Sequence, residues 1–167
     1  MKDNLTRSDI QKMEEEIEYR RLTLRPQLLE HVKSARAQGD LSENFEYHAA
    51  KKEKNQNESR IRYLERMIRT ANIIDDSSKD DEVGINNTVT VEFADDGSSE
   101  DYKIVTTVRA DSLKGLISIE SPLGRALMGR RAGDKVHVEV SADISYDVII
   151  KNIDKSTDDS GDKIRSY

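Results

Sequence analysis

The chain has 167 residues, of which 35% are hydrophobic and 36% charged, so it can form one ordinary domain or two small ones but hardly a single thick core. It contains no cysteine, which excludes disulfides and thiolate metal sites and fits a reducing compartment. The net charge of −6 argues against a protein that holds nucleic acid through its overall field. We find no signal peptide and no membrane-spanning run, and therefore expect a cytoplasmic protein that does not enter a membrane.

Residues 8–37 have the periodicity of a long helix. Ser8 and Gln11 have the spacing of a capping box at its start. Pro26 cannot donate an interior helical hydrogen bond, so we expect a bend or a restart near Arg25. The apolar residues recur at spacings of three, four or seven, as in the narrow seam of a coiled coil: Ile10, Met13, Ile17, Leu24, Leu28, Val32 and Ala35.

A second helix begins inside GDLSENFEYHAAK (39–51) and is expected to run to about Ile73. Its clearest seam is Ile61, Leu64, Ile68 and Ala71, whereas residues 51–58 contain almost no apolar side chain. Two long helices joined by a tight turn pack antiparallel. The sequence therefore predicts an α-helical coiled-coil hairpin over residues 1–75, with a polar distal end that stands in solvent.

The period changes to two after an acidic linker at residues 76–82. Five strands rich in Val and Ile are expected at 87–93, 101–108, 116–120, 135–140 and 146–153. Residues 121–129 predict a short helix with Pro122 at its first position. Residues 83–154 thus form a small α+β domain, and residues 155–167 are a polar tail that we expect to fray.

Asp40 and Glu43 lie three positions apart in the turn between the two predicted helices. One interpretation is local: an acid near a helix start acts as a cap and suits the helix dipole, although Ser42 could cap the same helix. The other interpretation is chemical, because two neighbouring carboxylates without a basic partner suit Mg²⁺. Two ligands are too few for a tight metal site, so another macromolecule would have to complete it.

Basic and aromatic residues flank these acids. Arg36, Lys51 and Lys52 are either ordinary solvated helix surface or a small patch that holds a nucleic-acid backbone. Phe45 and Tyr47 could stack on a base or a partner side chain, although packing across the turn explains at least one of them equally well.

Two stretches resemble a known family. GDLSENFEYHAAK, preceded by SARAQ and followed by a helix that ends in ANIID, resembles the tip motif of the GreA-type transcript cleavage factors of bacterial RNA polymerase. SPLGRALMGRRAGDKVHVEV is similar to the Ser-Pro…Arg-Ala-Leu…Gly…Gly-Asp-x-Val pattern of their C-terminal domain. The resemblance covers residues 5–153 in the family's order.

The resemblance implies an α+β fold class with an N-terminal antiparallel coiled coil and an FKBP-like C-terminal domain. It implies a transcription elongation factor that enters the secondary channel of RNA polymerase and stimulates cleavage of the backtracked nascent RNA 3′ end. The factor would not be an enzyme itself and would bind no cofactor tightly. Mg²⁺ would be shared with the polymerase active site, and we expect a monomer.

The family's motif also assigns roles by position. Asp40 and Glu43 match the tip acids, which position the metal and the attacking water. Asn44 and Tyr47 lie in the same motif as supporting residues. Arg36 and Lys51 match basic positions near the RNA 3′ end, with Lys52 beside them. Two further residues match the loop associated with polymerase docking: Ser121 and Pro122.

Two other functions remain open at this point. A non-cleaving channel binder could inhibit or modulate the polymerase, but such a plug would need no metal ligands, whereas this chain carries both Asp40 and Glu43. A coiled-coil adaptor or chaperone with an FKBP-like domain would leave the tip acids unexplained.

Overall fold

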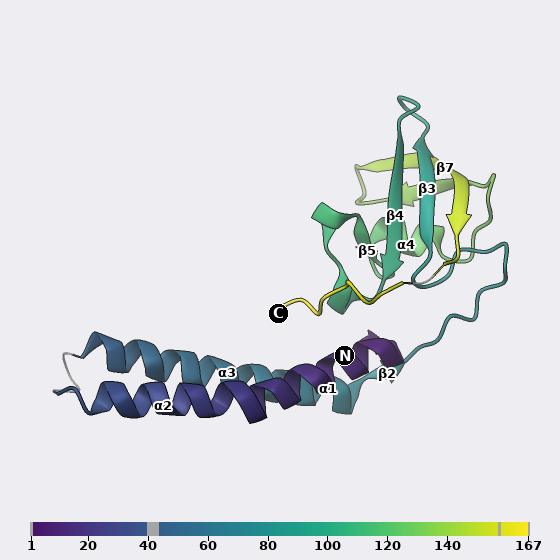
Figure 1. Cartoon of the computed structure of the whole chain (residues 1–167). Helices are drawn as coiled ribbons and strands as arrows, with labels where there is room; N and C mark the ends of the chain where they lie inside the picture. The colour runs from purple at the N-terminus through teal and green to yellow at the C-terminus, as the bar shows by residue number, and fades with distance from the viewer. Residues whose placement is uncertain (1, 40–43, 157, 167) are drawn as a thin grey trace. The chain divides into compact units, whose positions relative to one another are not determined.

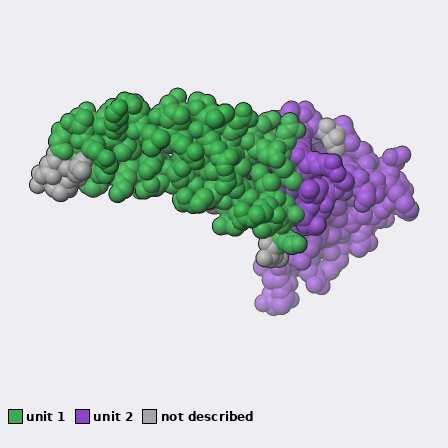
Figure 2. Space-filling view, turned by 90° about the horizontal axis from the view of Figure 1, so that it is seen from below, with its two compact units in different colours: residues 1–3, 10–71 green, residues 4–9, 72–167 purple. Residues whose placement is uncertain are grey.

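The computed structural model describes residues 2–39, 44–156 and 158–166, which fall into two compact units. Unit 1 contains Met1–Asp3 and Ile10–Ala71, and unit 2 contains Asn4–Asp9 and Asn72–Tyr167 (Figure 2). The long segment of unit 1, Ile10–Ala71, is thus inserted along the chain between the two segments of unit 2. No helix among the described residues combines the length and the apolar character needed to cross a membrane.

Unit 1 is built on a helical hairpin. Its first arm consists of α1 (Arg7–Tyr19), the π-helix η1 (Arg20–Leu24) and α2 (Arg25–Arg36), and its second arm is α3 (Phe45–Thr70). The second arm runs back beside α2 (Figure 1). The expected restart at Arg25 is confirmed. Pro26 has no N–H for the Leu22 carbonyl, and just before it the chain makes the wider turn in which Arg25 N–H bonds to Arg20 O.

The first helix begins earlier than the sequence indicated. Thr6 Oγ1 accepts a hydrogen bond from Asp9 N at 3.2 Å, and Asp9 Oδ2 accepts one from Thr6 N at 2.9 Å. This reciprocal pair is a capping box, and it replaces the one predicted at Ser8 and Gln11. Since Asp9 is fully buried, its cap is shielded from water.

The predicted seam of the first arm is buried or half-buried along its whole length. The expectation that the polar distal end at residues 51–58 stands in solvent was wrong at Asn57, and two residues outside that stretch are buried as well. Asn57 is 3% exposed, Arg60 is 6% exposed and Tyr47 is 8% exposed. Polar and aromatic side chains therefore continue the contact between the two arms where aliphatic residues run out.

Unit 2 is a mixed α+β structure around a curled five-stranded sheet, and the five predicted strands and the short helix are all present. The strand order is β5-β4-β3-β7-β6, with β4 and β5 parallel and the other neighbours antiparallel. The elements are β3 (Thr88–Phe93), β4 (Ser99–Val105), β5 (Leu116–Ser118), α4 (Pro122–Leu127), β6 (Lys135–Glu139) and β7 (Ser145–Asp154).

The core of unit 2 lies between one face of this sheet and α4. It is largely aliphatic, and its fully buried members alternate along the strands, as Val89 and Val91 do on β3. Leu123 and Leu127 come from α4, one helical turn apart. Burying each such side chain contributes about 1.5–3 kcal/mol, which explains how a charge-rich chain still forms a stable sheet.

Four short elements of unit 2 carried no periodic signal in the sequence. β1 (Asn4–Leu5) pairs in parallel with β2 (Asn72–Ile73). The two 3₁₀ helices are η2 (Thr107–Arg109) and η3 (Ser112–Lys114). Strands of two residues are too short to show alternation, so only the structure reveals that both ends of the hairpin insertion are tied together.

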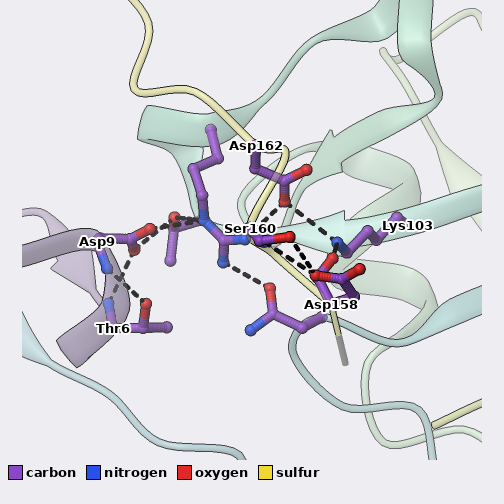
Figure 3. A network of polar contacts seen from close by, with 9 residues as sticks. Thr6, Asp9, Lys103, Asp158, Ser160 and Asp162 are labelled. Atoms are coloured by element: carbon purple, nitrogen blue, oxygen red, sulfur yellow. Dashed lines mark hydrogen bonds and ion pairs between the residues drawn. The ribbon is translucent and has the colours of Figure 1, made fainter. Parts of the chain in front are cut away.

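A buried ion network joins three segments of unit 2 (Figure 3). Arg109 and Asp9 are both fully buried, with Arg109 Nε 2.6 Å from Asp9 Oδ1. Arg109 Nη1 also lies 2.9 Å from Asp162 Oδ2, and Lys103 Nζ lies 3.2 Å from the same oxygen. The 155–167 stretch was predicted to fray; this is wrong for Asp162 and for Arg165, whose N–H bonds to Val108 O.

Candidate functional site at the hairpin turn

The candidate site is the turn between α2 and α3, at the end of the hairpin. The two predicted metal ligands, Asp40 and Glu43, lie outside the described residues. The structure describes the flanking residues up to Gly39 and from Asn44 onward. These flanks carry the other predicted tip residues and show what holds the turn.

Asn44 connects the two arms at the turn. Its side-chain oxygen accepts a hydrogen bond from Tyr47 N at 3.0 Å, which makes it the N-cap of α3. Its side-chain nitrogen donates to Ala35 O at 2.6 Å, satisfying a carbonyl in the last turn of α2. The capping role that the sequence left open between Asp40 and Ser42 therefore belongs to Asn44.

Arg36 and Tyr47 form a pair across the turn. The guanidinium carbon of Arg36 lies 5.6 Å from the centroid of the Tyr47 ring, within cation–π range. A hydrogen bond from Arg36 lowers the pKa of Tyr47 more than burial raises it, and the charges of Lys51, Arg36 and Lys54 lower it further. The phenol thus reports a positive local field at the end of the hairpin.

The two aromatic residues of the turn have different environments. Tyr47 is 8% exposed and its ring meets the His48 ring edge-on, with centroids 5.4 Å apart. Phe45, the first residue of α3, is 87% exposed. Packing therefore accounts for Tyr47, and Phe45 is the ring that remains available for stacking on a base or a partner.

Lys51 and Lys52 are exposed on the first half of α3, and Arg36 is exposed at the end of α2. None of the three forms an ion pair with another described residue. Positive side chains of this kind suit the phosphates of a nucleic-acid backbone, which they neutralise with release of counterions. The structure thus brings the predicted basic residues together with Asn44 and Tyr47 at one end of unit 1.

The donor chemistry of the turn fits a hard cation. Carboxylates at positions 40 and 43 are the oxygen ligands that Mg²⁺ uses, and Mg²⁺ commonly takes one or two of them with water and phosphate. Among the described residues there is no group of three or more His, Asp or Glu side chains that could hold a metal ion.

Ser121 and Pro122, predicted for polymerase docking, lie in unit 2 and not at the hairpin turn. Ser121 is the N-cap of α4: its Oγ accepts from Gly124 N at 3.0 Å and donates to Ser118 O at 2.6 Å. A Cβ at Gly124 would lie 1.9 Å from Ser118 O, so only glycine permits this close approach. Both residues shape the loop before α4, and both are half-buried.

The sequence reasoning missed a polar layer in the middle of the hairpin. We use this name for Glu16, Arg20, Asn57 and Arg60. The position of Arg20 in the sequence could have revealed this layer. Arg20 continues the three-four spacing of Ile10, Met13 and Ile17 and therefore lies on the seam. A polar residue at a seam position predicts a polar partner opposite, which here is Asn57.

The buried ion network of unit 2 was missed as well. Thr6 and Asp9 match the capping-box pattern of Ser or Thr followed three residues later by an acid, which could have located the helix start. Nothing in the sequence around Arg109 indicates its burial. Three segments far apart along the chain provide its partners, so no local pattern records the contact.

Comparison with known proteins gives two family matches. A family model described as the N-terminal part of transcription elongation factors matches residues 4–73. A second, described as the C-terminal part of the transcription elongation factors GreA/GreB, matches residues 78–155. The two matches together cover the hairpin and the five-stranded sheet.

Individual relatives show the same relationship. The transcription elongation factor GreA of Streptococcus gordonii is 44% identical over 153 residues, covering 91% of this chain and 95% of the relative. GreA of Streptococcus sanguinis is 42% identical with the same coverage. Among solved structures, GreA factor homolog 1 (Gfh1) of Thermus thermophilus aligns with a TM-score of 0.42 at 24% identity, covering 92% of this chain and 99% of that one.

Proposed function

The chain belongs to the GreA/GreB family of transcription elongation factors, and from this premise we propose that it stimulates RNA cleavage by bacterial RNA polymerase. The observation that carries the proposal is family membership along both halves of the chain together with two carboxylates in the turn of its hairpin. The polymerase's own active site would cut backtracked RNA near the 3′ end, and arrested complexes would resume transcription.

The hairpin is the part that would reach the reaction. We infer that it packs as an antiparallel coiled coil and enters the polymerase's secondary channel. Its second arm, α3, has 26 residues and is therefore about 39 Å long at 1.5 Å per residue. Unit 2, which we interpret as FKBP-like, would remain at the channel mouth, where the loop containing Ser121 and Pro122 would contact the polymerase.

The acidic and the basic residues of the tip would have different roles at the RNA 3′ end. Asp40 and Glu43 would supply carboxylate oxygens and orient the attacking water. Arg36, Lys51 and Lys52 would hold RNA phosphates. When bound between the two proteins, Mg²⁺ would lower the pKa of the water and stabilise charge on the phosphate.

Asn44 and Tyr47 would hold the ends of the two arms in place through contacts within the protein. Asn44 bonds to both arms, and Tyr47 packs beneath Arg36. Rigid support matters because a displacement of about 1 Å at a reacting group can cost about a hundredfold in rate. A monomer acting in the cytoplasm is sufficient for this mechanism, since all named tip residues come from one chain.

The alternative of a non-cleaving channel binder has less support. A binder that only blocks the channel needs no metal ligands, whereas this sequence has carboxylates at positions 40 and 43. Among the described residues, Lys51 and Lys52 are exposed cations near these positions in the sequence. The observations therefore favour stimulation of cleavage.

The proposal is tested with stalled, backtracked elongation complexes that carry labelled RNA. Addition of the protein should shorten the RNA from its 3′ end in the presence of Mg²⁺. Asp40→Ala and Glu43→Ala should abolish this shortening while leaving binding to the polymerase nearly unchanged. Glu46→Ala is the matched control, because it removes an equally charged, exposed side chain in the first turn of α3.

Each outcome decides between the functions. Absence of 3′ shortening by the unaltered protein would contradict stimulation, and inhibition without shortening would support the channel binder. Normal cleavage by both tip variants would show that the carboxylates have no chemical role.

A further inference from the structure

The seam of the hairpin changes phase once, in the first arm only. Up to Leu24 the seam positions alternate strictly by three and four, and Arg20 is one of them. Continuing that alternation would bring Gln27, His31 and Ser34 onto the seam, but all three are exposed. The residues that do face the second arm come one position later, and they are Leu28, Val32 and Ala35.

The π-helix η1 accommodates this change of phase. A π-turn adds one residue to a helix without ending it, and η1 (Arg20–Leu24) lies where the one-residue shift occurs. The second arm shows no such break. Its seam keeps the three-four alternation throughout, and each member is buried or half-buried: Tyr47, Ala50, Lys54, Asn57, Ile61, Leu64, Ile68 and Ala71.

The polar layer lies at this point of the hairpin. Arg20 Nη1 donates to Asn57 Oδ1 at 2.9 Å, and Asn57 Nδ2 donates back to Arg20 O at 3.2 Å. The carbonyl of Arg20 is also the acceptor of the π-turn. Asn57 therefore recognises both the side chain and the irregular backbone of the residue opposite it.

Glu16 and Arg60 complete the layer. Arg60 donates to both carboxylate oxygens of Glu16, at 2.8 and 3.2 Å, and Arg20 Nε donates to Glu16 Oε2 at 2.7 Å. The contacts of Asn57 and Arg60 with the first arm depend on an axial match between the arms, whereas the Arg20–Glu16 pair lies within the first arm. A slip of one helical turn, about 5.4 Å, would place Asn57 opposite an apolar seam residue and leave its amide unpaired.

Stability is a weak reason for such a layer. Replacing buried polar groups with well-packed apolar residues is often neutral or stabilising, whereas a single polar seam residue is known to specify the register of helices at some cost in stability. The connection does not fix the register alone. The connection between α2 and α3 is residues 37–44. It is longer than the connection of a tight helical hairpin, which has about two to five residues.

We propose that Arg20 and Asn57 are positioning residues that set the axial register of the two arms. The register determines how Arg36 at the end of α2 aligns with Asn44 and Tyr47 at the start of α3. This inference rests on the proposed function, because it assigns the layer a role in presenting the turn to the polymerase active site. Neither residue lies at the turn itself.

The register is tested first on the isolated protein, without polymerase. The chain has no cysteine, so Gln27→Cys and Gln56→Cys, both exposed and on opposite arms, can carry two nitroxide labels at defined positions. Pulsed electron resonance should give one narrow distance distribution. In R20L/N57L, a second population displaced by about one helical turn should appear, while the melting temperature stays equal or rises.

Matched variants separate register from general damage. R20L/N57L keeps the Glu16–Arg60 ion pair, so no buried charge is left alone. Asn57→Asp in the parent retains an acceptor for Arg20 and should keep the single population. Arg25→Leu with Glu58→Leu removes a neighbouring ion pair that is 37% and 28% exposed, and this pair should leave the distance unchanged. A distribution for R20L/N57L identical to that of the parent would overturn the proposal.

The second measurement is cleavage of backtracked RNA. R20L/N57L should lower the maximal cleavage rate by the displaced fraction seen in the distance distribution, about twofold if half of the molecules are displaced, since a turn misplaced by several ångströms would contribute almost no cleavage. The half-saturating concentration should not change, because unit 2 is unaltered. An unchanged maximal rate would overturn the positioning role. Failure of the unaltered protein to stimulate cleavage would instead contradict the proposed function, and the distance measurement would still decide the register.

Discussion

The two units each contain a polar cluster built on arginine and carboxylate, but the clusters differ in burial. In unit 2, Arg109 and Asp9 are completely buried. In the hairpin, the Glu16 side chain is 24% exposed and that of Arg20 is 26% exposed. The same chemical pair therefore works in a dry interior in one unit and with access to water in the other.

Burial changes what the cluster contributes. The effective dielectric constant falls with depth, so a buried charge that loses its partner has no solvent to replace it. A partly exposed charge is rehydrated when its partner is removed, so the loss of the partner costs less free energy. We infer that the unit 2 network decides whether three chain segments stay together, whereas the polar layer decides how two already stable helices align.

The largest expected effect is the loss of Asp9. Asp9→Ala leaves Arg109 buried beside Asp162 with one carboxylate in place of two, and it also removes the capping acceptor for Thr6 N. We expect the free energy of unfolding of unit 2 to fall by about 3–5 kcal/mol. Denaturant titration followed by the NMR signals of Tyr102 and Tyr146, both in unit 2, measures this change.

An exposed ion pair in the same unit is the control for Asp9. Asp81 pairs with Arg131 at 3.1 Å, but their side chains are 63% and 56% exposed. Asp81→Ala should therefore change the free energy of unfolding by less than about 1 kcal/mol. If both variants lost the same free energy of unfolding, burial would not explain the difference between the two ion pairs.

A smaller effect is expected from the acid titration of Glu16. Burial alone raises the pKa of Glu16, but hydrogen bonds and charge from Arg60 and Arg20 outweigh it and hold the pKa below its usual 4.5. A carboxyl with a lowered pKa in the folded state stabilises that state above its unfolded pKa, and the stabilisation is lost as pH falls through the folded pKa. The hairpin should thus lose about 1–2 kcal/mol well below pH 4.5.

Glu16→Gln tests this directly. The variant should be less stable than the parent at neutral pH, and the difference should vanish in acid, as followed by the helical circular dichroism of thermal melts. Glu18→Gln, an exposed residue two positions away on the same helix, is the control and should leave the acid dependence intact. If Glu16→Gln lost as much stability in acid as the parent does, Glu16 would not be the source of the acid dependence.

The smallest effect concerns one tyrosine at the hairpin turn. Because Arg36 donates a hydrogen bond to Tyr47 and nearby lysines add positive charge, the pKa of Tyr47 is lowered, whereas burial raises the pKa of Tyr102 in unit 2. Tyr47 should therefore lose its proton at lower pH than Tyr102 in an NMR titration of labelled rings. Arg36→Met should raise the pKa of Tyr47, and Arg62→Met, further along α3, should not.

The repeating elements of the fold could be predicted from the sequence because their signals are local. The seams of both arms, the restart before Pro26 and the alternation in β3 are all set by residues within a few positions of one another. The strand order, the pairing of β1 with β2 and the burial of Arg109 depend on contacts between distant segments. A sequence pattern records the face of an element but not its partner.

The candidate site divides in the same way. The motif between Gly39 and Lys51 identified Asn44 and Tyr47, yet only the structure assigns capping to Asn44 and packing to Tyr47. Residues 51–58, Asn57 among them, are expected from the sequence to stand in solvent because hydrophobicity is the criterion for burial. Asn57 and Arg60 are buried by pairing with other polar groups, which a search for apolar residues cannot detect.

The pairing of β1 with β2 has a consequence for the order of folding. Asn4 and Asn72, hydrogen-bonded through their side chains, are 68 residues apart in sequence, and closing so long a loop costs entropy that rises with the logarithm of its length. The contacts between α2 and α3 close a much shorter loop and form faster. Once the two arms have paired, the chain segments that contain Asn4 and Asn72 are close to each other. The long-range closure of unit 2 then starts from a short gap, so mutations that slow pairing of the arms should also slow the folding of the five-stranded sheet.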